Sequence, residues 1–327
     1  MANRYTDLSS YLKTAFGCRV QKITVDAGMS CPNRDGTLSH QGCIFCNTRG
    51  SGTGAHKRGL SITEQLERGK EALSRRYKAK KFIAYFQSYT NTYAPLPRLR
   101  ALYDEALAVD DVVGLSIGTR PDCVDKPVLD LLESYAADRM IWIEYGLQSA
   151  ADDTLGRINR GHTSACFSEA VCTARGRGIL ICAHVILGLP GEDRQTMMET
   201  ADFIARSGID GVKIHLLYVV RGTEMERRYR QGDYRCLEQN EYVSIVCEFL
   251  ERIPKEMIIQ RLTGDPHRDE LVAPTWALDK AGTLARIRAR LEELDTYQGK
   301  QCSRKINGRR VPSQIRNSKH EIRNKFE

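Results

Sequence analysis

Residues 31–46 read CPNRDGTLSHQGCIFC, and this cysteine loop holds three cysteines, Cys31, Cys43 and Cys46, among glycine and polar residues. Thiolate sulfur is the ligand that iron-sulfur clusters require, and a Cys-x2-Cys pair lets two sulfurs reach one metal centre. No fourth cysteine follows at a regular spacing, so one iron of a cubane cluster would lack a protein ligand. The loop therefore predicts a cluster with one open iron, where a substrate or cofactor binds.

Two other interpretations of the cysteine loop stay open on its residues alone. A structural zinc ion needs a fourth ligand, which His40 or His56 would supply. A disulfide fits less well, because three cysteines cannot all pair and nothing in the sequence indicates export. Cys18, beside a strand-like run, is more typical of a small buried hydrophobic residue than of a ligand.

The composition is that of a soluble folded protein. With 327 residues, 41% of them hydrophobic, the chain can bury one large core or two smaller ones. The N-terminal stretch lacks the apolar core of a signal peptide, and no run is long enough to span a bilayer. Eleven cysteines, an odd number, fit a reducing compartment. We therefore expect a cytoplasmic protein with no membrane partner.

Basic residues gather at the C-terminal end of the chain. The formal net charge is +8, and residues 300–327 alone hold nine Lys or Arg against two Glu, so the rest is nearly neutral. This basic tail has no apolar periodicity, which predicts disorder. It is either an arm that grips phosphates or an incidental extension.

Strand-like apolar runs alternate with helical patterns along most of the chain. These runs lie within residues 19–27, 81–87, 112–122, 140–149, 179–193 and 211–224. A helical pattern follows each of them, and the one after the cysteine loop starts with a capping box formed by Ser61 and Glu64. Because the runs are nearly continuous rather than alternating, they indicate parallel strands buried on both faces.

Distinctive polar residues follow the first five strands, and a barrel collects such loops on one rim. The sequence has neither the glycine pattern of a dinucleotide fold nor a P-loop. We therefore predict an α/β fold of the partial (β/α)6 TIM-like barrel type. The barrel is expected over about residues 18–235, with a C-terminal α/β extension over about 236–299 in the same unit and the tail beyond it.

Five further segments, in order along the chain, carry a resemblance to a known family. They are GTRPD at 118–122, EYGLQS at 144–149, NRGHT at 159–163, HVILGLPGE at 184–192 and KIHLLYVVRGTEM at 213–225. With the widely spaced cysteines, the chain resembles a radical S-adenosylmethionine (SAM) enzyme of the group related to the catalytic subunit of Elongator. The resemblance favours an open cluster over zinc.

The resemblance implies the cofactors. A 4Fe-4S cluster would be held by Cys31, Cys43 and Cys46, with SAM chelating the open iron through its amino and carboxylate groups. One electron from the cluster then cleaves SAM, and the resulting 5'-deoxyadenosyl radical abstracts a hydrogen atom from the substrate. An electron donor such as flavodoxin or ferredoxin is the implied partner.

SAM-contacting residues are also implied by the resemblance. Phe45 matches an aromatic position near the adenine, with simple loop packing as its alternative, and Gly188 lies in the GLPGE segment. The usual glycine-glutamate motif after the second strand is replaced by QSYTNTY, so Gln87, Ser88 or Thr90 is expected to meet the methionine end.

Two positions on the fourth strand, Glu144 and Gln148, resemble ribose contacts, although a structural salt bridge is the alternative for Glu144. Among residues expected to face the substrate, Arg120 would pair with a carboxylate. Arg160 and His162 would face substrate or phosphate, unless the RGHT turn is structural.

The implied substrate is tRNA. About 100 residues follow the sixth strand, too few for the acetyltransferase domain of Elongator, so the chain resembles the shorter bacterial members of the group. For these, the resemblance implies conversion of a carboxymethylaminomethyl group to aminomethyl at C5 of the wobble uridine. Basic residues are expected around the barrel mouth to grip phosphates, namely Arg49, Lys57, Arg58, Arg157, Arg160, Arg221, Arg227 and Arg228.

Two alternatives to this function remain. The first is the same radical chemistry on a protein or a small molecule. The second belongs to another class, a non-catalytic RNA-binding module stabilised by zinc. The colour of the anaerobically purified protein distinguishes the radical enzyme from the zinc-stabilised module, since iron-sulfur protein is brown and zinc protein is colourless.

Overall fold

The structure is a computed structural model that describes residues 3–47 and 54–302. Its centre is a curled sheet of seven parallel strands, which confirms the predicted α/β partial barrel. The strands follow one another across the sheet in chain order: β1 (Val20–Val25), β2 (Lys81–Phe86), β3 (Val112–Thr119), β4 (Met140–Gln148), β5 (Leu180–Leu187), β6 (Gly211–Leu216) and β8 (Ile258–Arg261).

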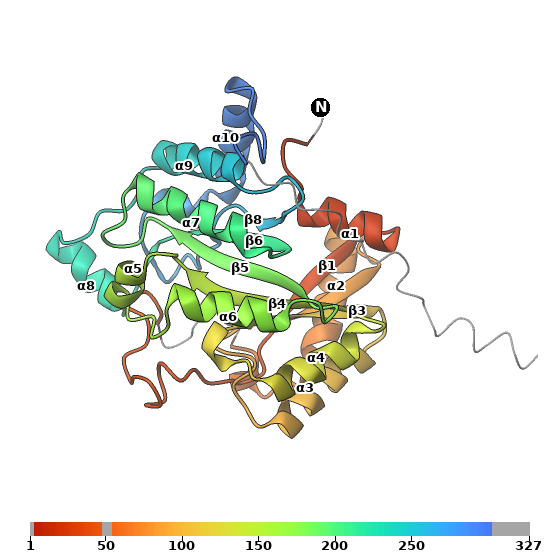
Figure 1. The fold of residues 1–327 in the computed structure, drawn as a ribbon. Coiled ribbons are helices and arrows are strands. Elements are labelled where there is room, and N and C mark those ends of the chain that lie inside the picture. Colours follow the sequence, from red (N-terminus) through yellow and green to blue (C-terminus); the bar gives the residue numbers. More distant parts are fainter. Residues whose placement is uncertain (1–2, 48–53, 303–327) are drawn as a thin grey trace, which may run out of the picture.

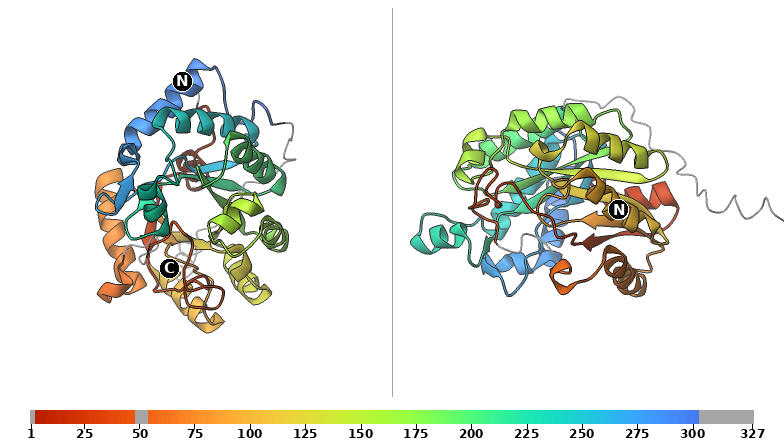
Figure 2. Two further views of the ribbon diagram at one scale, coloured as in Figure 1. Left: turned by 90° about the vertical axis from the view of Figure 1, so that its left-hand side faces the viewer. Right: turned by 90° about the horizontal axis from the view of Figure 1, so that it is seen from below.

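Helices cover the outer face of this sheet, as the end-on view in Figure 2 shows. The crossover helices are α2 (Ile62–Tyr77), α3 (Leu96–Ala108), α4 (Lys126–Ala136), α6 (Ser164–Ala174), α7 (Arg194–Ser207) and α9 (Gln239–Arg252). The predicted capping box is confirmed, because the amide of Glu64 donates to Ser61 Oγ at 3.1 Å and the amide of Ser61 donates to Glu64 Oε2 at 2.8 Å. Crossover helices of this kind bury the outer face of the curled parallel sheet.

Several short elements complete the fold. They are helices α1 (Leu8–Phe16), α5 (Asp152–Arg157), α8 (Glu224–Gln231) and α10 (Lys280–Glu293), the antiparallel pair β7 (Val219–Val220) and β9 (Leu271–Ala273), and the 3-10 turns η1 (His56–Arg58), η2 (Pro121–Cys123) and η3 (Thr275–Leu278). Helices α5 and α8 and strand β9 were not predicted from the sequence, and neither was α1. It packs with Leu12 against Val20, Trp142 and Ile258, and so covers the amino ends of the strands from inside.

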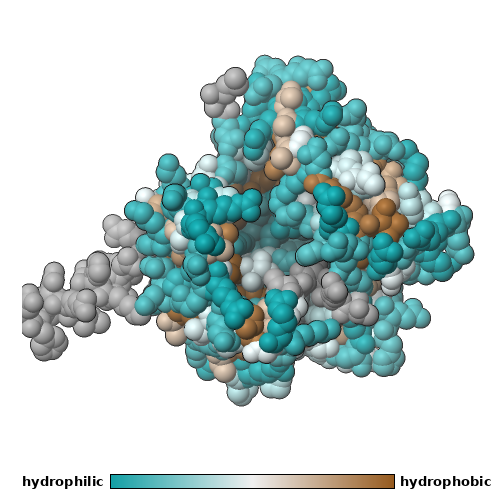
Figure 3. Space-filling model, turned by 180° about the vertical axis from the view of Figure 1, so that it is seen from behind, coloured by the Kyte–Doolittle hydropathy of each residue, from teal (hydrophilic) through white to brown (hydrophobic). Residues whose placement is uncertain are grey.

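The barrel remains open on one side. β1 and β8 are the two edges of the sheet, and the N-terminal segment adds an isolated bridge between Asp7 and Ile259 at the β8 edge. From behind, the surface is hollowed near its middle and surrounded mainly by hydrophilic residues (Figure 3). No helix in the described part of the chain is long and apolar enough to cross a membrane. Arg49 and the tail from residue 303 lie outside the described residues.

Candidate functional site

The cysteine loop follows β1 at the carboxyl end of the sheet and is tied to loops from later strands. Within it, the amide of Cys46 donates to the carbonyl of Cys43 at 2.9 Å. The amide of Ile44 donates to the carbonyl of Ile158, after β4, at 3.1 Å, and the Ile44 carbonyl accepts from Met225 in α8 at 3.0 Å. Residues far apart in the sequence thus meet on one rim, as a barrel requires.

Two nitrogen donors point at the sulfur of Cys43. Asn33 Nδ2 and Arg160 Nη1 each lie 3.6 Å from Cys43 Sγ. Asn33 Nδ2 also donates to the carbonyl of Asn159 at 2.6 Å, which fixes its orientation. Hydrogen bonds to cluster sulfurs are one way in which a protein tunes iron-sulfur centres.

Gly146, near the end of β4, lets two predicted site residues approach each other. Arg160 donates to the Gly146 carbonyl from Nε at 3.2 Å and from Nη2 at 2.7 Å. A Cβ atom at Gly146 would lie 2.7 Å from both Arg160 Nη2 and Gln148 Nε2. Gln148 itself has φ of 75°, a left-handed conformation that is uncommon for residues other than glycine and that often marks functional sites.

The QSYTNTY segment after β2 holds buried hydroxyl groups with unused hydrogen-bonding capacity. The amide of Thr90 donates to the carbonyl of Ser30, just before Cys31, at 3.1 Å. The side-chain oxygens of Ser88 and Thr90 are buried and have no hydrogen-bond partner within the described chain. Gln87 starts the segment, and its amide donates to the Val25 carbonyl at 3.2 Å. A polar ligand beside the cysteine loop would satisfy the two hydroxyls.

The GTRPD segment positions a buried arginine that already has a partner. Arg120 is 2% exposed and donates to both carboxylate oxygens of Asp122, at 2.8 and 2.7 Å. Its Nη1 donates to the carbonyl of Arg160 at 2.8 Å, and His162 Nε2 lies 3.2 Å from the Gly146 carbonyl. Burial, followed by repulsion from Arg160 and Arg120, lowers the pKa of His162 to about 4. His162 is therefore neutral at pH 7.

A charged cluster lies inside the barrel around Glu144 of β4, which is fully buried. Lys22 Nζ of β1 contacts Glu144 Oε1 at 2.5 Å, and His184 Nε2 of β5 lies 2.7 Å from Oε2. Lys213 of β6 donates to Oε2 and Ser116 of β3 to Oε1. Both carboxylate oxygens are thus occupied by protein groups, which supports the salt-bridge interpretation of this residue over a ribose contact.

Burial and charge compete within this Glu144 cluster. Burial opposes ionisation of Glu144, but the attraction of Lys213 and Lys22 outweighs it and holds the pKa of the carboxyl well below its usual range. Burial lowers the pKa of Lys213 to about 7, against the attraction of Glu144. Sequence reasoning missed the cationic members of the cluster. The available signal was a lysine in the middle of an otherwise apolar strand, as in VQKITV and GVKIHL.

The remaining predicted contacts have roles within the protein. Phe45 packs against the apolar cluster that includes Leu155 and Met225. Gly188 has φ of 84°, a hypothetical Cβ there would lie 2.9 Å from Leu237, and its carbonyl accepts from Tyr234. These contacts explain an aromatic residue and a glycine at the two positions without a ligand. SAM contacts by Phe45 and Gly188 therefore stay predictions.

Some of the residues predicted to form a basic rim are buried or paired with carboxylates. Arg227 and Arg228 in α8 pair with Glu224 at 2.5 and 3.1 Å, and Arg160 is buried. Arg221 is exposed, between β7 and α8, as are Lys57 and Arg58 in η1. Three of the predicted rim cations are thus buried or already paired within the described residues.

Iron-sulfur ligation is supported by the chemistry of the donor set and not by a preformed geometry. Across residues 3–47 and 54–302, no three Cys, His, Asp or Glu side chains are gathered closely enough to hold a metal ion. Burial raises the pKa of Cys46, and Cys43 and Cys31 are close enough to raise it further. A hypothetical Cβ at Gly28 or Gly36 would collide with the ring of His56 or His40, respectively, so each ring packs on a glycine. Three thiols in one loop with donors at Cys43 fit a cluster.

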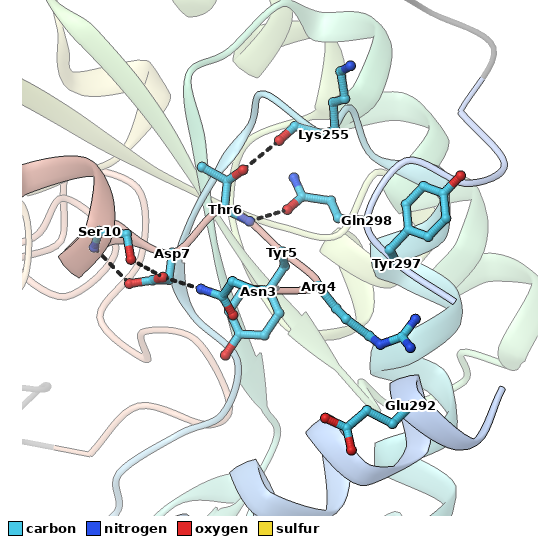
Figure 4. Close-up of a pocket in the computed structure, with 10 residues that line it drawn as sticks. All are labelled: Asn3, Arg4, Tyr5, Thr6, Asp7, Ser10, Lys255, Glu292, Tyr297 and Gln298. Atoms are coloured by element: carbon cyan, nitrogen blue, oxygen red, sulfur yellow. Dashed lines mark hydrogen bonds between the residues drawn. The ribbon is translucent and has the colours of Figure 1, made fainter. Parts of the chain in front are cut away.

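A cavity of about 790 Å³ lies away from this rim, between the N-terminal segment and residues 292–298. Thr6 anchors it by donating from Oγ1 to the carbonyl of Lys255 and from its amide to Gln298 Oε1 (Figure 4). No cysteine or histidine lines it. This cavity separates the N-terminal segment from residues 292–298 and is not part of the site.

Comparison with known proteins identifies the family. The model of the radical SAM superfamily matches residues 37–204, and that of the radical SAM C-terminal domain matches residues 209–293. The protein YtqA of Bacillus subtilis is 44% identical over 297 residues, which is 91% of this chain and 92% of YtqA. YhcC of Escherichia coli K12 is 41% identical over 266 residues, covering 81% of this chain and 85% of YhcC.

More distant relatives belong to Elongator. Elongator complex protein 3 of Saccharomyces cerevisiae is 28% identical over 191 residues, which is 56% of this chain and 32% of the yeast protein. Among solved structures, the archaeal Elp3 of Methanocaldococcus infernus, with its N-terminus deleted, superposes with a TM-score of 0.63 at 16% identity. The superposition covers 85% of this chain and 64% of that one. This likeness concerns the fold.

Proposed function

The chain belongs to the radical SAM superfamily, in a group related to the radical SAM region of Elongator complex protein 3, and on that premise we propose a tRNA-modifying enzyme. It acts on the C5 side chain of the wobble uridine and converts carboxymethylaminomethyl to aminomethyl. Abstraction of a hydrogen atom from the carboxymethyl CH2, loss of one electron to a one-electron acceptor and hydrolysis of the resulting imine by water would release the two carbons as glyoxylate. The observation that carries this proposal is the cysteine loop with the polar ends of β2, β3 and β4 around it.

The proposed ligands of a 4Fe-4S cluster are Cys31, Cys43 and Cys46. When bound, the cluster supplies the electron that cleaves SAM and so generates a 5'-deoxyadenosyl radical. The protein's own residues hold and orient the proposed cluster ligands. Asn33 and Arg160 donate to Cys43 and hold its sulfur in place.

SAM would lie between the cysteine loop and the ends of β2 and β4. The unpaired hydroxyls of Ser88 and Thr90 suit the polar methionine end, and Gln148 beside Gly146 suits the ribose. Arg160 donates to the Gly146 carbonyl and thereby fixes the backbone of β4 next to Gln148. Arg120 has Asp122 as its carboxylate, so its proposed role is to position Arg160 through the Arg160 carbonyl.

Support for tRNA comes from the Elongator relatives and the exposed cations Lys57 and Arg221. A flipped base could enter the open barrel, since a radical confined beside SAM cannot reach a stacked nucleoside. Each phosphate contact releases counterions, so binding should weaken steeply with salt.

Nucleoside analysis of bulk tRNA tests the proposal. A strain lacking the gene should accumulate carboxymethylaminomethyluridine and lose its aminomethyl derivative, and wild-type protein should restore the parental pattern while a Cys46→Ala variant should not. An unchanged nucleoside profile would remove tRNA as the substrate and leave a protein or small molecule. Colourless, zinc-containing protein after anaerobic purification would support the RNA-binding module instead.

A further inference from the structure

The side chain of Arg261, the last residue of β8, has no partner among the described residues. Its side chain is partly buried, and within the described chain it makes no hydrogen bond or ion pair. In the pairing of β6 with β8, Lys213 lies opposite Arg261, which puts both residues on the same face of the sheet. That face is the inner one, because Lys213 reaches Glu144 inside the barrel. A guanidinium that faces the barrel interior and makes no ion pair within the described residues can bind an anionic ligand.

Gln260, next to Arg261, is also incompletely bonded. The register of β6 and β8 shifts at this point and skips Gln260, a bulge that re-aims side chains. Its Oε1 accepts from Lys22 Nζ at 2.6 Å, whereas its Nε2 is buried without an acceptor in the described residues. A buried unsatisfied donor costs free energy, so the Gln260 amide next to the Arg261 guanidinium suits a ligand that offers hydrogen-bond acceptors.

Within the described residues, the carboxylates in the vicinity of Arg261 already have partners. Glu144 is fully used by Lys22, Ser116, His184 and Lys213. Two other carboxylates, like Arg261, lie within electrostatic range of Tyr218. Both of them have partners. Asp265 pairs with Lys280 at 2.7 Å, and Glu270 accepts from Asn47 at 3.1 Å.

The surroundings of Arg261 are otherwise cationic or neutral. Burial, followed by repulsion from Arg261 and His184, keeps the pKa of His215 well below its usual value, so this histidine is neutral and can donate or accept. His184 and His215 lie with ring centroids 5.6 Å apart. The inner wall of β5, β6 and β8 therefore carries excess positive charge, which favours an anion.

This wall adjoins the cysteine loop. Tyr218, just beyond β6, lies within electrostatic range of both Arg261 and Cys46. A Cβ at Gly264, shortly after β8, would lie 2.6 Å from the Tyr218 ring, so glycine there lets the ring pack closely. Tyr218 thus lies on the side of the barrel that links Arg261 with the cysteine loop.

We propose that Arg261, with Gln260 beside it, binds the carboxylate of the group being modified. This inference rests on the proposed function, whose substrate carries a carboxymethyl group that its product lacks. A guanidinium binds a carboxylate through two parallel N–H donors, which fixes the orientation of the carboxylate as well as its position. Arg261 therefore selects substrate over product and directs the adjacent CH2 group toward SAM.

The test compares two anticodon stem-loop RNAs that differ only in carrying carboxymethylaminomethyluridine or aminomethyluridine. Their phosphates are identical, so a difference in affinity reports the carboxylate. Wild-type protein should bind the first about tenfold or more tightly than the second. Arg261→Met should bring the ratio close to one, and Arg261→Lys should retain part of it. The matched control is Arg288→Met, at an exposed arginine of α10, which should keep the wild-type ratio.

Separate outcomes distinguish this inference from the proposed function. If wild-type protein binds both RNAs equally, or Arg261→Met keeps the full ratio, the carboxylate site is wrong while tRNA binding stands. SAM affinity should be unchanged in Arg261→Met, and a parallel loss of SAM binding would assign the arginine to the SAM carboxylate instead.

If wild-type protein binds neither stem-loop, the tRNA proposal is contradicted. The carboxylate site at Arg261 is then tested with a probe that contains no RNA. Phenylglyoxal modification of Arg261, followed by mass spectrometry, should be slowed by N-methylglycine but not by dimethylamine, which lacks the carboxylate. Inorganic phosphate at the same ionic strength should protect less. Equal modification under all conditions would show that Arg261 holds no carboxylate.

Discussion

The guanidinium of Arg160 joins two parts of the site, because Nη1 lies 3.6 Å from Cys43 Sγ while Nε and Nη2 hold the carbonyl of Gly146. Arg160 thus connects the cysteine loop to β4, the strand that carries Gln148. A proposed cluster ligand and a proposed SAM contact are positioned by one buried side chain. Disturbing β4 at this point should therefore affect cofactor binding as well as local packing.

Each of Cys31, Cys43 and Cys46 should be required for the cluster, because removal of one thiolate leaves an iron without a ligand. Single Cys→Ala variants should lose most of their iron and sulfide after anaerobic reconstitution. Cys18→Ala should keep the wild-type content. A full complement of iron in Cys43→Ala, or its loss in Cys18→Ala, would refute the ligand assignment.

Gly146→Ala should weaken SAM binding without unfolding the protein. The new Cβ would lie 2.7 Å from both Arg160 Nη2 and Gln148 Nε2, so the two side chains must move. Since effects of small displacements on binding are large, we expect about a tenfold loss of affinity. Gly156→Ala is the matched control in helix α5, where a Cβ meets nothing within 4 Å. Isothermal titration with SAM measures both, and equal affinities would contradict the role of Gly146.

Glu144→Gln should destabilise the fold strongly, because it leaves Lys22 and Lys213 without their buried counter-charge. Breaking a buried pair by removal of one partner costs about 3–5 kcal/mol. Asp130→Asn is the control, since Asp130 makes exposed ion pairs with Lys126 and Arg177 and such pairs contribute little. Urea unfolding should show a large drop in midpoint for Glu144→Gln only. Similar midpoints for the two variants would mean that the Glu144 cluster is not a structural ion network.

Glu192 should make stability depend on pH. Burial raises the pKa of Glu192 to about 7, although Ser149 donates to its carboxylate and opposes the shift. An unfolded glutamate releases its proton near pH ~4.3. Between these values the folded state retains a proton that the unfolded state has lost, so stability falls as the pH rises through this window.

Glu192→Gln removes this titration. Relative to the wild type, the variant should gain stability between pH 5 and pH 8, on the order of 2 kcal/mol. Thermal unfolding in buffers across that range measures the difference. Parallel stability profiles for the two proteins would show that Glu192 titrates normally in the folded state.

The strands and crossover helices were predictable from the sequence because their signals are local. Near-continuous apolar runs predicted six parallel strands, and the capping box at Ser61 located the start of α2. Helix α1 was missed, since its nine residues are half polar and its stability depends on packing against Trp142 of β4. A contact over such a distance in the chain leaves no local pattern.

The site was predictable only in part for the same reason. The cysteine loop is compact in sequence, so its spacing indicates chemistry directly. Lys22 and Glu144 are 122 positions apart, and their pairing depends on which neighbouring strands face inward. Arg261 shows the same limit, because the skipped residue in the register of β6 and β8 decides which side chain points into the barrel.

The most direct test of the account is SAM cleavage by the reconstituted protein with dithionite. The account predicts 5'-deoxyadenosine by chromatography, formed slowly with SAM alone and faster with tRNA that carries carboxymethylaminomethyluridine, with aminomethyluridine appearing in step. Cys46→Ala is the matched control and should form neither product. If the wild-type protein forms no more 5'-deoxyadenosine than Cys46→Ala, with or without tRNA, then the chain does not perform radical SAM chemistry and the account fails.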